Sequence, residues 1–224
     1  MIAYVIKRKS EYSVKDKYKQ HKADLVEGLN FVKGCKGMLQ TMIFASSINF
    51  FIAPIMLLLP FYVSEQLSAD AQWYGFLLAA MAFGSILGYW FSATLNVNGS
   101  RRTLVMFTSM FLLACSLMML SQSVSPVFSL IGILVTGLSL GIFNLQATTL
   151  FQKHSPTEMR GRVMSLLMTI SSGLLPIGLL IGGGLGTLTN NDTQLIFGLS
   201  SLSIAVLTIF TSLNSNVRCF TFNS

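Results

Sequence analysis

Two asparagines in otherwise apolar stretches are the residues of this sequence best suited to contact a small molecule. Asn49 and Asn144 each lie inside a long run without a charged residue. An amide both donates and accepts hydrogen bonds, and polar side chains within such runs avoid lipid. We hypothesise that Asn49, Phe50, Asn144 and Ser172 line a substrate path. Two alternatives remain open, because the polar groups can equally bond neighbouring helices and the Phe50 ring can equally face lipid.

The one short catalytic motif is Gly137-Leu-Ser-Leu-Gly141, which matches G-x-S-x-G. A nucleophile elbow needs a strand-to-helix turn and a histidine. This match lies inside an apolar run, and both histidines, His21 and His154, lie outside such runs. The sequence also lacks a phosphate-binding G-x-x-x-x-G-K-[ST] and a cluster of metal ligands. We therefore expect no enzymatic activity, no cofactor and no metal.

The composition predicts an all-α membrane protein. Of the 224 residues, 52% are hydrophobic and 10% are charged, whereas soluble domains carry about 25% charged residues. A membrane-spanning helix needs about 20 apolar residues. Runs of this kind, without Asp, Glu, Lys, Arg or His, occupy residues 39–63, 73–95, 103–120, 127–150, 163–188 and 195–213. We predict six transmembrane helices.

The positions of the charges predict the orientation of these helices. All 15 Lys and Arg residues lie before the first run, in the gaps after the second and fourth, or after the sixth. The other gaps hold Glu65, Asp70 and Asp192 and no base. Cytoplasmic loops are the ones enriched in Lys and Arg. We expect a multi-pass protein of the cell (inner) membrane with both termini cytoplasmic, and we read the net charge of +7 as topology rather than nucleic-acid binding.

Three segments are expected. Residues 1–38 form a cytoplasmic linker. An amphipathic helix begins near Asp24 and carries Leu25, Leu29 and Val32 on one face. It lies along the cytoplasmic membrane face or against the bundle, or it is an ordinary short surface helix. Residues 39–213 form the bundle, and residues 214–224 are a cytoplasmic tail.

Small residues predict where the helices approach closely. G-x-x-x-G pairs allow close backbone contact in membranes. Such pairs include Gly84 with Gly88, Gly137 with Gly141, and Gly182 with Gly186. We assign these six glycines to helix packing.

Several segments together resemble a known transporter family. Asn49-Phe-Phe-Ile-Ala-Pro54, Leu59-Pro-Phe-Tyr-Val63, Phe83-Gly-Ser-Ile-Leu-Gly88 and Arg160-Gly-Arg-Val163 are similar to the second half of a major facilitator transporter. The best match is the drug-efflux branch that includes macrolide and siderophore exporters. The resemblance covers about residues 22–213.

The resemblance implies half of a major facilitator fold and a partner. Such transporters have two six-helix halves with substrate between them. The chain is then the C-terminal half of an efflux pump for a small amphipathic compound, and residues 1–6 are the tail of the preceding helix. Its partners would be the lipid bilayer, the substrate, and a missing N-terminal half or a second copy. The alternative is a truncated, non-transporting six-helix protein.

The resemblance also implies proton coupling and gating loops. Since the six runs hold no carboxylate, a proton carrier would have to come from the missing half. Asn96 stands where the family commonly has an acidic residue. If an Asp–Arg pair gates the transporter, this half does not supply its acid. The implied gating residues are Asn96, Gly99, Arg101, Arg102, Arg160 and Arg162.

Overall fold

The computed structural model describes residues 26–95 and 99–222, and these residues form helices joined by short turns. A first helix covers residues 26–34. The elements after it are α2 (Lys36–Phe61), the π-helix η1 (Tyr62–Gln66), α3 (Gln72–Thr94), α4 (Ser100–Gln122), α5 (Pro126–His154), α6 (Arg160–Leu188), α7 (Thr193–Leu213) and α8 (Ser215–Phe222).

Six of these helices are long and apolar enough to cross a membrane. They coincide with the six predicted runs, so the protein is an all-α, multi-pass membrane protein. The differences lie at the ends. The helix α5 continues to His154, and the expected C-terminal tail folds into α8. Asp24, the expected start of the first helix, lies outside the described residues.

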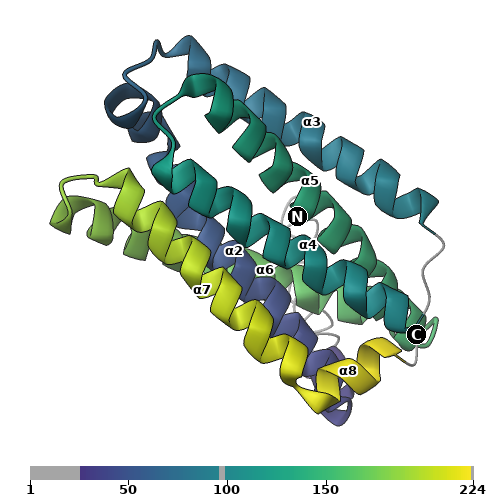
Figure 1. Cartoon of the computed structure of the whole chain (residues 1–224). Helices are drawn as coiled ribbons and strands as arrows, with labels where there is room; N and C mark the ends of the chain where they lie inside the picture. The colour runs from purple at the N-terminus through teal and green to yellow at the C-terminus, as the bar shows by residue number, and fades with distance from the viewer. Residues whose placement is uncertain (1–25, 96–98, 223–224) are drawn as a thin grey trace, which may run out of the picture.

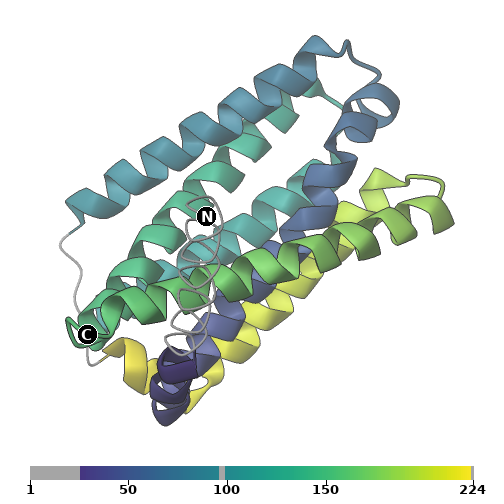
Figure 2. The same cartoon turned by 180° about the vertical axis from the view of Figure 1, so that it is seen from behind.

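The long helices pack in a spatial order that differs from their order in the chain. The contacts run from α3 to α5, α4, α7, α2 and α6, so α3 and α6 form the two flanks (Figures 1 and 2). The packing of α3 on α5 corresponds to that of α6 on α2 if α2–α4 and α5–α7 are two repeats. Inverted repeats of three helices are typical of the halves of major facilitator transporters.

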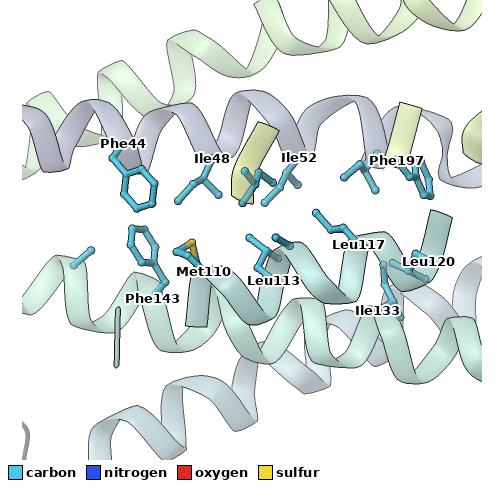
Figure 3. Packing of buried hydrophobic residues seen from close by; sticks show 14 of the residues in the cluster. Phe44, Ile48, Ile52, Met110, Leu113, Leu117, Leu120, Ile133, Phe143 and Phe197 are labelled. Atoms are coloured by element: carbon cyan, nitrogen blue, oxygen red, sulfur yellow. The ribbon is translucent and has the colours of Figure 1, made fainter. Parts of the chain in front are cut away.

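The core is a row of apolar side chains between α2 and the helices α4, α5 and α7 (Figure 3). Phe44, Ile48 and Ile52 recur every fourth residue and therefore lie on one face of α2. The Phe44 ring meets the Phe143 ring edge-on, with centroids 5.7 Å apart and an angle of 82°. Since lipid is as apolar as these residues, close packing rather than escape from water stabilises this contact.

The helices α3 and α5 meet through reciprocal glycines. Gly84 abuts the Leu134 carbonyl oxygen, and Gly137 abuts that of Met81. Gly88 and Gly141 repeat the arrangement one turn further on. A Cβ at any of the four would overlap backbone atoms of the other helix. This α3–α5 seam therefore requires glycine on both sides.

The helices α2 and α6 meet through glycines on α6 alone. A Cβ at Gly178 would lie 2.8 Å from the Cβ of Ala53, and one at Gly182 would lie 2.7 Å from the Cβ of Pro54. At Gly186 the nearest neighbours are side-chain atoms, at 3.0 Å or more. In this α2–α6 seam the α2 side is thus formed by the Phe50 carbonyl oxygen and by Ala53, Pro54 and Leu58.

Polar side chains of η1 bond to other helices at the end of the bundle that carries Glu65 and Asp192, called here the acidic end. The Tyr62 and Ser129 hydroxyl oxygens are 2.6 Å apart. The Gln66 amide nitrogen donates to the Ser123 carbonyl oxygen at 2.9 Å, and its oxygen accepts from the Thr193 hydroxyl at 2.6 Å. These bonds join η1, α5, α7 and the turn after α4.

At the opposite, basic end, α8 packs beneath the long helices. Val217 is buried, and Phe220 lies against the rings of Phe151 and His154. The Thr103 hydroxyl donates to that of Thr221 at 2.7 Å. The C-terminal segment is therefore part of the folded bundle.

Candidate functional site

Asn49 lies near the middle of α2 and is exposed. The apolar helix that contains it spans Lys36–Gln66, so Asn49 is about 3 Å from its midpoint. Its amide nitrogen donates to the Ala45 carbonyl oxygen at 3.3 Å. Among the described residues its amide oxygen has no hydrogen-bond donor, so it is available to a ligand.

Asn49 lies between two packed faces of α2. The Phe44 and Ile48 face meets α5 and α4, and the Ala53 face meets α6. The amide therefore opens toward the side of the bundle that lies between α5 and α6.

Asn144 lies on α5, about 6 Å from the midpoint of Pro126–His154, and is also exposed. It lies between Gly141, which packs on α3, and Phe143, whose ring meets α2. At 3.6 residues per turn, Asn144 is about 160° around the helix from Phe128, which is exposed on the outside of the bundle. Its amide makes no hydrogen bond to the described part of the chain. Both asparagines therefore open toward the same side, between the α3 and α6 flanks.

The same side is bounded by the two least buried helices. In the most apolar 18-residue stretch of each helix, 22% of the residues of α3 and 11% of those of α6 are buried. The corresponding shares are 61% for α2 and 50% for α5. The two most buried helices, α2 and α5, thus carry the amides. The flanking helices α3 and α6 leave apolar surface uncovered on either side of them.

Ser172 is exposed on a polar stripe of α6 that includes Ser165 and Thr169. The Thr169 hydroxyl donates to its own helix, at the Ser165 carbonyl oxygen. The neighbouring Ser171 faces α2 instead, with its hydroxyl oxygen 3.2 Å from that of Ser46. Ser172 is therefore free to face a ligand, whereas Ser171 joins two helices.

Phe50 is placed differently from the two amides. It is about 100° around α2 from Asn49, and its ring meets the Phe51 ring edge-on at 5.0 Å. Its carbonyl oxygen lies against Gly178 of α6. The structure thus places Phe50 beside the α2–α6 seam rather than together with Asn49 and Asn144.

The residues assigned to the gating loops lie at the basic end. Gly99 has φ 53° at the start of α4, a conformation that favours glycine. Arg101 is exposed and Arg102 is buried, while Asn96 lies outside the described residues. Arg160 donates from Nε to the Ser155 carbonyl oxygen at 3.2 Å. Arg162 forms an ion pair with Glu27, with an N–O distance of 2.7 Å.

Hydrolase and metal chemistry find no support in this arrangement. Ser139 of the G-x-S-x-G match is buried inside α5, about 22 Å along the helix from His154. Within residues 26–95 and 99–222, no group of three or more His, Cys, Asp or Glu residues could hold a metal ion.

One polar residue was not singled out from the sequence. Gln146 is 4% exposed, and its amide donates to the Ser92 hydroxyl at 3.0 Å. It holds α5 to α3 near the basic end of the bundle. In the sequence, Gln146 could have been noticed as an amide side chain within an apolar run, in the same way as Asn144. Only the packing separates a structural amide from an open one.

Comparison with known proteins decides the family. The family described as transmembrane secretion effectors, within the major facilitator superfamily, matches residues 2–220. The chain belongs to this family. It is a major facilitator protein, as its sequence resemblance predicted.

Curated relatives of this major facilitator chain include macrolide efflux protein A of Streptococcus pyogenes. The two are 26% identical over 161 residues, which make up 70% of this chain and 39% of the relative. The protein of the same name from a serotype M6 strain of that species matches equally. The chain thus aligns with well under half the length of these relatives. No solved structure matches it.

Proposed function

We propose that this chain is the C-terminal half of a secondary-active efflux transporter and carries half of a substrate path. The single observation that supports this best is the position of Asn49 and Asn144. Two open amides lie on one side of the bundle at mid-membrane depth, in the two central helices. Transporters of this superfamily bind substrate near the midplane, between two halves.

The proposed substrate is a small amphipathic compound such as a drug or siderophore. Asn49, Asn144 and Ser172 are the polar contacts, and Phe50 contributes from the edge of the path. These hydroxyl and amide groups are uncharged, and they can recognise a substrate by donating and accepting hydrogen bonds. The proposed proton coupling then depends on a carboxylate outside these six spans.

The proposed partner is an N-terminal six-helix half, with a second copy of this chain as the other possibility. Such a partner would cover the apolar faces of α3 and α6. Halves that rock against each other would expose the path alternately to the two sides of the membrane.

The experiment that tests this function is an accumulation assay in cells. The DNA upstream of the Met1 codon is read for six further spans, and both segments are then expressed together and separately. We expect cells with both segments to accumulate less of a fluorescent or radiolabelled macrolide than cells with either one. Equal accumulation in all strains would favour the alternative, a truncated protein without transport activity.

The proposed orientation places the basic end in the cytoplasm, because moving Lys or Arg through the bilayer is costly. In a variant with Cys35, Cys115 and Cys219 replaced by serine, single cysteines are introduced at Glu65, Arg101 or Asp192. We expect an impermeant maleimide outside intact cells to label positions 65 and 192 but not 101. Labelling at 101, without labelling at the other two, contradicts the proposed orientation.

A further inference from the structure

The helix α6 is attached to the bundle almost entirely through α2. Its contacts with α5 and α7 are slight, whereas α3, the other flank, packs extensively on α5. Only 11% of the residues in its most apolar 18-residue stretch are buried, which is half the share for α3. Within the described part of the chain, the Ser46–Ser171 pair is the hydrogen bond that joins the middle of α6 to another helix.

The two flanking seams also differ in how firmly they interlock. In the α3–α5 seam, glycines on both helices lie against backbone carbonyl oxygens of the other helix. In the α2–α6 seam the glycines belong to α6 alone. Gly178 lies against the Phe50 carbonyl oxygen and the Ala53 side chain, and Gly182 lies against Pro54. Because only one of the two helices supplies glycines, the backbones of α2 and α6 interlock less than those of α3 and α5.

At the basic end, the helix of residues 26–34 holds the start of α6. The Arg162 guanidinium pairs with the Glu27 carboxylate at 2.7 Å. One residue further on, Gly28 lies against the Arg162 backbone, where a Cβ would be 3.2 Å from the carbonyl oxygen. The same short helix is anchored to the bundle by Val32, which is fully buried in the core cluster. It therefore bridges the core and the end of α6.

We propose that the helix of residues 26–34 is a strap that latches α6 through the Glu27–Arg162 ion pair. With the latch closed, the basic end of α6 is held to the bundle. With the latch open, the basic end of α6 loses this ion pair, and the α2–α6 seam remains its main attachment to the other long helices. The segment before α2 thereby controls the mobility of one flank of the substrate path. This inference concerns the folded chain itself and does not depend on transport.

The test is amide hydrogen exchange, followed by mass spectrometry, on the purified chain in detergent. We expect α6 to exchange faster than α3, although both flanks are largely uncovered. We expect Glu27→Gln to raise exchange in residues 160–172 about two- to five-fold, the range of a partly exposed ion pair. Exchange in α5 should stay unchanged, because the strap does not hold that helix.

The matched control is Glu158→Gln, which removes the same charge from the exposed turn before α6, where Glu158 forms no ion pair with the described residues. The charge reversal Glu27→Arg with Arg162→Glu should return exchange in residues 160–172 to within about twofold of the parent, since it re-forms the pair. The latch is refuted if Glu27→Gln behaves like the control, if exchange rises equally in all helices, or if the reversal does not restore protection. Equal exchange in α3 and α6 of the parent refutes the weak attachment of α6.

Discussion

Gly137→Leu is expected to separate α3 from α5 and to abolish the native bundle. The Met81 carbonyl oxygen and the Ser85 amide nitrogen of α3 occupy the space that a side chain at 137 would need. Backbone atoms of a continuous helix cannot rotate away, so the whole helix must move. Even one added methyl in a packed interior costs about 1–3 kcal/mol, and leucine adds four carbons. The measurement is the monodisperse fraction of detergent-extracted protein in size-exclusion chromatography.

The control for this change is Gly184→Leu on α6, where an added Cβ would meet no atom within 4 Å. That substitution should leave the monodisperse fraction close to that of the parent. A bundle that tolerates leucine at 137 as well as at 184 would show that the α3–α5 seam does not determine how these helices pack.

Replacing Asn49 and Asn144 together by alanine is expected to reduce export about tenfold in the assembled two-half transporter. Each amide would lose a hydrogen bond to substrate, and such bonds contribute about 0.5–1.5 kcal/mol. Neither side chain holds two helices together in the structure. The Asn49 amide donates to its own helix, and the Asn144 amide makes no hydrogen bond to a described residue. Membrane abundance should therefore be unchanged. The readouts are the initial rate of substrate efflux and the amount of protein in the membrane fraction.

Ser47→Ala is the matched control for the asparagine variant. Ser47 lies two residues from Asn49, and its hydroxyl donates only to its own helix at the Ile43 carbonyl oxygen, 2.9 Å away. It should leave export unchanged. Unaltered export in the double asparagine variant would remove both amides from the substrate path, whereas a parallel fall in abundance would assign them a structural role.

The number and limits of the spanning helices follow from sequence because they depend on local properties. Uninterrupted apolar length decides whether a segment spans the bilayer, and no long-range contact is needed for that. The six runs accordingly reappear as α2 to α7, with small extensions such as that to His154. The family could also be recognised, because short segments such as Arg160-Gly-Arg-Val163 are retained in order along the chain.

The use of each polar residue was decided only by the tertiary structure. Ser46, Asn49 and Ala53 recur with a helical spacing that predicts a shared face, yet Ser46 and Ala53 are buried and Asn49 is exposed. Asn144 and Gln146 are both amides in α5, but one is open and the other is bonded to Ser92. A turn of about 100° per residue separates these fates, and the neighbouring helix that lies there is set by packing across the whole bundle.

The sequence by itself determined that this is a membrane protein with six spans. It also determined that Lys and Arg lie only before the first span, in alternate gaps and after the last span. Both properties can be read from sequence because hydrophobicity and charge act residue by residue. The tertiary structure alone decided that α3 and α6 are the flanks, that α8 belongs to the bundle, and that Glu27 meets Arg162. Those contacts join residues far apart in the chain, and close packing of whole helices rather than any local pattern selects them.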